Sequence, residues 1–290
     1  MKYAATIGFF DGVHLGHSFL LSQLKRQAEE RGMGTLAVTF GTHPRELLTG
    51  VPVPLLTSGQ ERVSLLRSLA GNVAVLDFAE VRTLTAADFL CFLRDKYDVR
   101  LLLMGYDHRF GSDRLSSPAG YAACGRSAGV EIVFAEQAPE GAVSSSAVRD
   151  ALLRGDVAAA ATMLGRPYSF GGTVVHGRGL GRTIGFPTAN ILPSEPRQLM
   201  PESGVYAARL FVRSGAASSG SEWRAVVNVG TNPTVGNLAL SVEAHLPDYK
   251  GADLYGSSVV LSFLRRLRGE CRFPSLDALR DRIALDILSL

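Results

Sequence analysis

A glycine-rich stretch near the amino end of the chain carries two histidines three residues apart, His14 and His17, and reads G-F-F-D-G-V-H-L-G-H over residues 8–17. If a helix begins here, one turn directs both imidazoles at a single anion, and the unpaired N–H groups of that turn favour a phosphate. Imidazole donors so placed can stabilise charge that develops on a phosphoryl oxygen. A plainer interpretation is that the glycines shape a turn and the histidines cap a helix. The nucleotide contacts predicted in this stretch are Gly8, Phe9, Asp11 and Gly16.

A second glycine-rich stretch, H-G-R-G-L-G-R-T-I-G-F-P-T-A-N, covers residues 176–190. Backbone N–H groups of such a loop can wrap phosphate oxygens. Thr188 and Asn190 are two residues apart, so they face the same side of an extended segment, and their hydroxyl and amide oxygens suit Mg²⁺ shared with phosphate. A loop of glycine and arginine alone is more often an ordinary hairpin connection. The predicted phosphate contacts are Gly177, Gly179, Gly181 and Arg182.

A third stretch, S-V-E-A-H-L over residues 241–246, alternates polar and apolar side chains. This period predicts a strand with Ser241, Glu243 and His245 on its polar face. An isolated glutamate or histidine in that position is usually solvated, so the alternation alone assigns neither of them a function.

The first half of the chain must position the histidine stretch, and it alternates short apolar runs with helical patterns. Strand alternating with helix implies parallel strands joined by right-handed crossovers, hence a doubly wound sheet. Ligands bind such sheets outside the carboxyl ends of the strands, where residues 8–17 fall. The predicted strands cover 3–7, 35–40, 73–77, 101–105 and 130–135, and the predicted helices 17–31, 58–69, 85–97 and 115–128.

The second half reads differently. After two short helices, 147–154 and 156–164, strands at 172–176, 205–212, 224–229, 240–246 and 257–263 are separated by turn residues, and a helix over 275–288 ends the chain. This order predicts a small, mainly antiparallel barrel with a terminal helix. We place the domain boundary between Arg166 and Pro167, giving domains of residues 1–166 and 167–290.

Composition bounds the class of protein. The 290 residues are 46% hydrophobic and 20% charged, as in globular proteins. Thirty Lys and Arg against 27 Asp and Glu leave a net charge of +3, too little over this length for a duplex-binding surface. Three cysteines without a C-x-x-C pair fit a reducing compartment without a zinc site. The chain shows neither a signal-peptide pattern nor an apolar run long enough to span a membrane, so we expect a cytoplasmic protein.

The histidine stretch resembles the H-x-G-H signature of nucleotidyltransferases, which attach a nucleotide monophosphate and release pyrophosphate. Residues 103–111 (L-M-G-Y-D-H-R-F-G), 39–44 (T-F-G-T-H-P), 144–149 (S-S-S-A-V-R) and G-F-P-T-A-N at 185–190 narrow this resemblance to the bacterial bifunctional riboflavin kinase/FMN adenylyltransferases, also called FAD synthetases. Segments 227–234, 253–256 and 267–273 are similar to the kinase part of that family, so the matching motifs span nearly the whole chain.

The resemblance implies a Rossmann-like nucleotidyltransferase domain joined to a riboflavin kinase barrel, with riboflavin, FMN, FAD and ATP as substrates and products and Mg²⁺ as cofactor. It makes Glu243 the base for the ribityl 5′-OH and gives His14 and His17 transition-state roles. Thr188 and Asn190 would hold Mg²⁺. It further implies ATP contacts from Ser144, Ser145 and Arg149, and flavin contacts from Asp107, Phe110, Glu270 and Phe273.

Two departures from the family pattern leave alternatives open. Phe9 stands where the family usually has Asn, and Gly41-Thr42 replaces a usual Asp-Pro, and both could reshape the nucleotide pocket. One alternative is therefore a riboflavin kinase whose adenylyltransferase half has drifted. Another is a non-catalytic flavin-binding regulatory protein, although such a protein has no need of a base or a transition-state clamp.

Overall fold

A computed structural model of the chain describes residues 1–105, 108–137, 143–177, 179–213, 220–234 and 237–290. The chain divides into two compact units, residues 1–144 and 145–290, which we describe separately as the sheet unit and the barrel unit. Within the described ranges, no helix combines the length and the apolar character needed to cross a bilayer.

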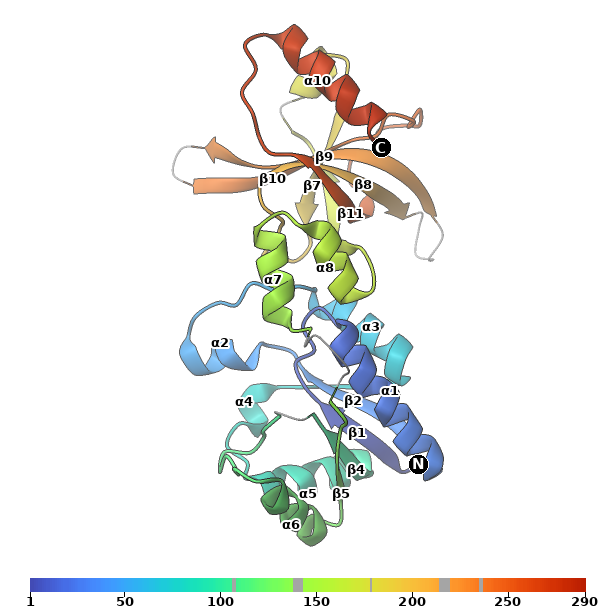
Figure 1. Cartoon of the computed structure of the whole chain (residues 1–290), viewed down its shortest axis with the longest axis vertical. Coiled ribbons are helices and arrows are strands. Elements are labelled where there is room, and N and C mark those ends of the chain that lie inside the picture. Colours follow the sequence, from blue (N-terminus) through green and yellow to red (C-terminus); the bar gives the residue numbers. More distant parts are fainter. Residues whose placement is uncertain (106–107, 138–142, 178, 214–219, 235–236) are drawn as a thin grey trace. The chain divides into compact units, whose positions relative to one another are not determined.

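The sheet unit is a parallel five-stranded sheet with the order β3-β2-β1-β4-β5 (Figure 1). Chain order and spatial order reverse between β1 and β4, so the topological switch point, where such sheets bind ligands, lies at the carboxyl ends of these two strands. The elements are β1 (Tyr3–Ile7), α1 (Leu15–Glu30), β2 (Gly34–Phe40), α2 (Pro44–Thr49), α3 (Gly59–Ala70), β3 (Asn72–Leu76), α4 (Phe78–Val81), α5 (Ala86–Tyr97), β4 (Val99–Met104), α6 (Pro118–Ala128) and β5 (Glu131–Phe134).

Two apolar cores cover the two faces of this sheet. Adjacent residues of β1 point to opposite faces: Ala4 packs with Leu21 and Leu24 of α1, whereas Ala5 packs with Phe89 and other side chains of α5 and α6. Helices therefore bury both faces, which explains why the strands read as continuous apolar runs rather than as alternating ones.

The barrel unit is a closed six-stranded barrel with the order β10-β7-β6-β11-β8-β9, and all its strand pairs are antiparallel. Closure leaves no open sheet edge. The aromatic rings of Tyr168, Phe170 and Tyr206 pack around Phe263 inside it. The elements are α7 (Ser145–Leu153), α8 (Val157–Leu164), β6 (Tyr168–Val175), α9 (Leu180–Thr183), β7 (Thr188–Pro193), β8 (Gly204–Arg213), β9 (Gly220–Thr234), β10 (Asn237–His245), β11 (Ser258–Arg268) and α10 (Leu276–Leu288).

Helices α7 and α8 pack with the barrel. Helix α8 lies against β11 and β6. The Arg266 guanidinium donates to the carbonyls of Arg154 and Ser203, and the Glu202 N–H donates to the carbonyl of Leu152 at 2.9 Å. The compact units thus separate before α7, whereas the boundary predicted between Arg166 and Pro167 assigns both helices to the first domain. That boundary stays a prediction.

The predicted fold class is confirmed: a doubly wound parallel sheet is followed by a small antiparallel barrel with a terminal helix. The sequence analysis missed the short helices α2, α4 and α9 and the strand β7. Strand β7 begins T-A-N, which lacks the apolar alternation of a half-buried strand, and its pairing with β6 and β10 defines it instead.

Candidate active sites

The histidine stretch forms the turn between β1 and α1. The N–H of Gly8, the first residue after β1, donates to the carbonyl of Val38 on β2 at 3.0 Å. The start of the turn is therefore bonded to the sheet. It then passes through left-handed backbone at Phe10 (φ 58°), Gly12 (φ 79°) and Val13 (φ 41°). A positive φ is strained for a ring-bearing or β-branched residue, and such strain persists only where surrounding contacts impose it.

Both predicted catalytic histidines lie at the start of α1, with their rings stacked 3.6 Å apart between centroids. His14 is the N-cap, and its Nδ1 accepts the N–H of His17 at 3.4 Å. Because Nδ1 is the acceptor, a neutral His14 carries its proton on Nε2 and presents it as a donor. Burial, and secondly the nearby His14, hold the pKa of His17 well below its usual 6.5. The His17 imidazole is therefore neutral at neutral pH.

Asp11 holds this turn in place. Its buried carboxylate accepts the N–H of Leu56 at 3.0 Å on both oxygens and the N–H of Thr57 at 3.3 Å. The Thr57 hydroxyl in turn accepts the N–H of Gly12 at 3.3 Å. The structure thus shows Asp11 anchoring the loop, whereas its predicted contact with the nucleotide stays a prediction.

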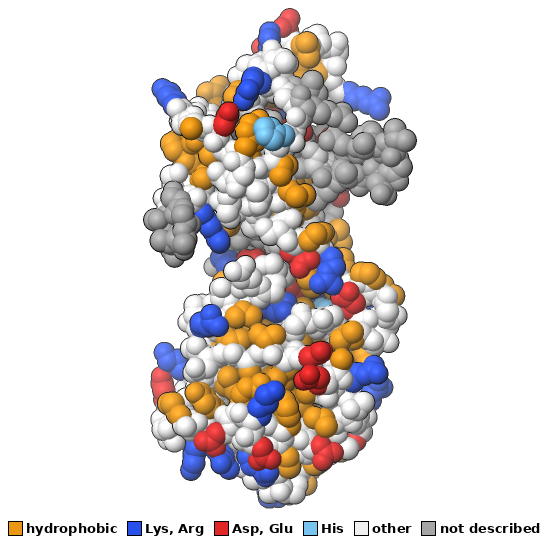
Figure 2. Space-filling view, turned by 180° about the vertical axis from the view of Figure 1, so that it is seen from behind, with side chains coloured by type: hydrophobic (Ala, Val, Ile, Leu, Met, Phe, Trp, Pro, Cys, Tyr) orange, Lys and Arg blue, Asp and Glu red, His pale blue; other side chains and the backbone are white. Residues whose placement is uncertain are grey.

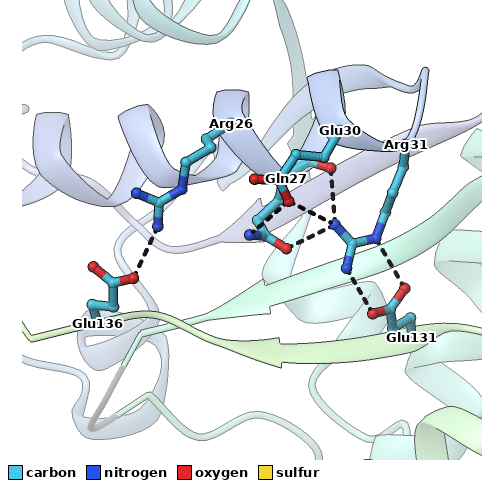
Figure 3. A network of polar contacts seen from close by, with 6 residues as sticks. All are labelled: Arg26, Gln27, Glu30, Arg31, Glu131 and Glu136. Carbon is cyan, nitrogen blue, oxygen red and sulfur yellow. Dashed lines mark hydrogen bonds and ion pairs between the residues drawn. The ribbon is translucent and has the colours of Figure 1, made fainter.

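Residues 131–136 are attached to α1 by side-chain contacts. Figure 3 shows the exposed part of this attachment, in which Arg26 pairs with Glu136 at 3.0 Å and Arg31 pairs with Glu131 through two nitrogens. Exposed pairs contribute only about 0.2–1 kcal/mol each. The buried Gln23 amide makes the more protected contacts, accepting the N–H of Glu136 at 2.8 Å and donating to its carbonyl at 3.2 Å.

Val143 also lies near the start of α1. Its carbonyl oxygen would be 3.2 Å from a Cβ placed on Gly16. Gly16 therefore allows residue 143 to approach the first turn of α1, and Ser144 follows directly at the end of the sheet unit. Ser145 and Arg149, also predicted to contact ATP, lie on α7 of the barrel unit. Their predicted role stays a prediction.

An apolar pocket of about 470 Å³ opens at the carboxyl ends of β1 and β2. The predicted nucleotide residues Gly8 and Phe9 and the predicted flavin residue Phe110 line it together with Phe40 and Phe89. Asp107, the other predicted flavin contact in this unit, lies outside the described residues.

Phe9, one departure from the family pattern, contacts His43, which directly follows the other departure, Gly41-Thr42. The ring of Phe9 lies 4.4 Å from that of His43 and 4.0 Å from the guanidinium carbon of buried Arg62. A cation over an aromatic face is an attractive contact, so Phe9 packs well in a place where the family usually has an amide. Phe9 is thus one of several aromatic residues that line the pocket.

Strand register assembles the candidate site of the barrel unit. In the antiparallel pair β7–β10, Glu243 is opposite Asn190 and His245 is opposite Thr188. Opposite residues share a face of the sheet, so the predicted base lies beside both predicted metal ligands. The hydroxyl of Thr188 donates to Oε2 of Glu243 at 3.3 Å, and that of Ser241 donates to Oε1 at 3.2 Å. The Nδ1 atom of His245 contacts the carbonyl of Pro187 at 2.8 Å.

Two pockets meet at Thr188, which lines both of them. The larger one, of about 840 Å³, is also lined by Glu243, Glu270 and Phe273 and by side chains of α10. The smaller one, of about 270 Å³, is lined by Arg182 and Tyr255 among others. Predicted flavin residues thus gather in one pocket and a predicted phosphate residue in the other. Thr188 lines both, and its hydroxyl donates to the carboxylate of Glu243, which lines the larger pocket.

The glycine-rich loop leads into both pockets. A Cβ on Gly177 would overlap the side-chain amide of Asn190, and one on Gly181 would overlap the carbonyl of Phe186, so both glycines serve close approach. Gly181 lines the larger pocket, while Gly179 begins α9 with φ 70°. Arg182 pairs at 3.5 Å with Asp253 on the wall of the smaller pocket.

The sequence analysis missed several residues of these sites. Ser241 was assigned only to a polar strand face, and Asn228, opposite Glu243 on β9, was one residue of a family motif. Gly230 belongs to the same motif, and the Glu270 carboxylate occupies the space where its side chain would be. The alternation over residues 241–246 already placed Ser241 beside Glu243, and that signal could have identified it.

The sheet unit is doubly wound with stacked histidines at its first helix, and the barrel unit holds a carboxylate bonded to a threonine that lines two pockets. These features are typical of a two-domain enzyme that transfers phosphate-containing groups. The family model described as FAD synthetase matches residues 1–147, and the one described as riboflavin kinase matches residues 164–290. The chain belongs to the bifunctional riboflavin kinase/FMN adenylyltransferase family.

Curated relatives support this assignment over almost the full length. The bifunctional riboflavin kinase/FMN adenylyltransferase of Haemophilus influenzae is 36% identical, with 98% of this chain and 92% of that protein covered. The protein of the same name from Escherichia coli K12 is 37% identical, with 98% and 90% covered. A crystal structure described as a macrolide-efflux protein from Streptococcus pneumoniae superposes with a TM-score of 0.87 at 28% identity and covers 99% of this chain and 93% of its own.

Proposed function

We propose that this chain makes FAD from riboflavin in two ATP-dependent reactions, one in each unit. In the first, the γ-phosphoryl group of ATP moves to the ribityl 5′-OH, giving FMN and ADP. In the second, the FMN phosphate attacks the α-phosphorus of ATP, giving FAD and pyrophosphate. The observation that carries the proposal is that both family models match one chain, each over a unit in which the predicted reactive side chains are together.

In the barrel unit we place riboflavin in the larger pocket and ATP in the smaller one. Glu270 and Phe273 would contact the flavin, and Glu243 would accept the proton of the 5′-OH as it attacks. The glycine-rich loop, with Gly177, Gly179, Gly181 and Arg182, would hold the ATP phosphates. Support comes from the hydrogen bond between Glu243, which lines the larger pocket, and Thr188, which lines both, because phosphoryl transfer depends mainly on positioning and charge neutralisation.

Mg²⁺ fits the chemistry of Thr188 and Asn190, whose hard oxygen donors lie on the face that carries Glu243. Across the described residues there is no cluster of three or more His, Cys, Asp or Glu side chains that could hold a metal alone. An ion held by a hydroxyl, an amide and the phosphates of ATP agrees with that finding. Bound there, Mg²⁺ would neutralise phosphate charge. The Thr188 hydroxyl can offer its oxygen to the ion and still donate its proton to Glu243.

In the sheet unit the start of α1 would bind the phosphates at the reaction centre. His14 offers an Nε2–H donor, and neutral His17 stacks beside it, where charge on the transferring phosphate can be stabilised. Gly16 leaves room for residues 143–144 to approach that phosphate. Ser144, at the end of this unit, would contact ATP, and Ser145 and Arg149 stay predicted ATP contacts. The FMN ring system would occupy the aromatic pocket that Phe9 and Phe110 line.

We also propose that the protein works in the cytoplasm on small molecules and does not bind nucleic acid. The net charge of +3 supports this, as does the face in Figure 2, where basic and acidic side chains are interspersed rather than gathered into one basic surface.

Incubation of the purified chain with riboflavin, ATP and Mg²⁺, followed by separation of the flavins, tests the proposal. We expect FMN to appear first and FAD to follow. Accumulation of FMN without FAD would mean that the adenylyltransferase half is inactive, as the departures at Phe9 and Gly41-Thr42 would allow. Unchanged riboflavin would contradict both reactions and favour a flavin-binding protein.

A further inference from the structure

Ser241 makes a contact that the reaction scheme above does not use. It lies on β10 two residues before Glu243, so both side chains point to the same face. Its hydroxyl donates to Oε1 of Glu243 at 3.2 Å, while Thr188 donates to Oε2 at 3.3 Å. We propose that Ser241 is a positioning residue that fixes the Glu243 carboxylate for proton transfer from the flavin 5′-OH. This inference rests on the proposed role of Glu243 as the base.

The need for such a residue follows from the freedom of a glutamate side chain. A general base must be within about 2.6–3.2 Å of the proton it takes. Glu243 is only half-buried and lines a pocket of about 840 Å³, so packing alone does not fix its carboxylate. Two hydroxyl donors, one on each oxygen, do fix it. Each carboxylate oxygen keeps a further lone pair, so the substrate hydroxyl can still bind.

A second acidic side chain, that of Glu270, lies near Ser241. Ser241 is opposite Gly230 in the β9–β10 pair. The Glu270 carboxylate occupies the space above Gly230, so a second acidic group lies at the level of Ser241. Both acidic side chains line the larger pocket, and the Ser241 hydroxyl bonds to Glu243 at the level where Glu270 lies.

Ser241 differs from Thr188 in what a substitution would disturb. Thr188 lines both pockets and is a proposed Mg²⁺ ligand, so its loss would change several functions together. Ser241 is not among the described residues that line either pocket. Its effect on the reaction must therefore pass through Glu243, and this makes the proposal testable by non-additivity.

The test compares Ser241→Thr with Ser241→Val in the full-length chain, because the two replacements share a shape and only Thr keeps the hydroxyl. Steady-state riboflavin phosphorylation gives kcat and KM, and FMN-to-FAD conversion by the same sample reports an intact chain. We expect Ser241→Val to lower kcat about tenfold with KM for riboflavin and ATP within about twofold, and Ser241→Thr to stay within about threefold of the parent. Ser262→Ala, a half-buried serine on β11, is the matched control and should change neither value.

A double-mutant cycle completes the test. In a Glu243→Gln background, Ser241→Val should cause no further loss, because the carboxylate it positions is already gone. Equal activity of the Thr and Val variants, a loss expressed mainly in KM, or fully additive losses would each overturn the proposal. Full kinase activity of Glu243→Gln alone would instead show that Glu243 is not the base, a failure of the proposed function that this arm identifies separately.

Discussion

In the sheet unit the two predicted catalytic histidines come from a single stretch of four residues, whereas the barrel unit takes Thr188 and Glu243 from strand positions that are 55 residues apart. The histidine site depends on a turn with left-handed backbone at Phe10 and Val13, held by Asp11. The carboxylate site depends on the register of β7 against β10. The positions of the two histidines thus depend on contacts that hold one loop. The position of Glu243 beside Thr188 depends on how two strands pair.

This difference determines which changes each site tolerates. A one-residue slip of β10 would turn Glu243 away from Thr188, but closure of the barrel opposes such a slip because every strand is paired on both sides. The turn before α1 has no comparable ladder, and the contacts of Asp11 with residues 56–57 take that role. Because both sites lie on one chain, each activity serves as the internal control for substitutions in the other.

The largest effect is expected from Glu243→Gln. Loss of a general base typically costs 10²–10⁴-fold, so riboflavin phosphorylation should fall by about 10³-fold while FMN-to-FAD conversion stays unchanged. Measuring both conversions on the same protein sample checks this. Parallel loss of the two activities would contradict separate sites and remove the basis of the comparison.

His17→Ala should impair FAD formation and spare riboflavin phosphorylation, with a somewhat smaller loss of activity than Glu243→Gln causes. Removing one group that stabilises transition-state charge costs about 10²–10³-fold, so FAD formation from FMN should fall by that factor while riboflavin phosphorylation persists. The flavin products separate the two steps directly. Normal FAD synthesis by this variant would exclude His17 from the mechanism.

Asp11→Asn tests whether the anchors of the turn matter as much as the histidines themselves. The amide keeps the size of Asp11 but replaces one accepting oxygen with an NH₂ group facing the Leu56 and Thr57 N–H groups. Hydrogen bonds to a charged group are worth about 1.5–3 kcal/mol, so the sheet unit should melt about 4–8 °C lower, with FAD formation reduced and riboflavin phosphorylation retained.

Asp77→Asn is the matched control for Asp11→Asn. Asp77 is the exposed N-cap of α4 in the same unit, and Asn caps helices about as well as Asp. Calorimetry of the parent chain and the two variants shows which transition belongs to the sheet unit. A melting temperature for Asp11→Asn equal to that of Asp77→Asn would show that the turn does not depend on this anchor.

The same contrast between local and non-local signals explains what the sequence could predict. The alternation of strands and helices, and the motif before α1, are local patterns, and the structure confirmed the doubly wound sheet and the start of α1 beside the histidines. Helix α2 has no buried residue and therefore gives no apolar period. Strand β7 was missed because its partners, not its composition, make it a strand.

Roles that depend on contacts across the fold were beyond sequence reasoning. Gln23 sits among apolar residues of α1, and nothing local indicates that its amide pairs with the backbone of Glu136, 113 positions away. Asp11 was assigned to the nucleotide because its partners at residues 56–57 are 45 positions distant. For buried polar residues such as these, the structure supplies the hydrogen-bond partners that the sequence alone does not indicate.

The smallest expected effect is a pH dependence of the sheet unit alone. Burial, together with the neighbouring His14, lowers the pKa of His17 in the folded chain, whereas in the unfolded chain it is near the ordinary 6.5. As the pH falls below about 6.5, the unfolded state therefore binds a proton that the folded state refuses, and stability declines until the folded pKa is reached. In calorimetry at pH 7.5 and 5.5, the transition that Asp11→Asn identifies should move down by about 2–4 °C.

His17→Gln is the control, because glutamine does not titrate in this range, and this variant should show a smaller shift. An equal shift of the melting temperature in both proteins would mean that other groups cause the pH dependence. The neutral imidazole of His17 would then not distinguish the histidine site from the carboxylate site of the barrel.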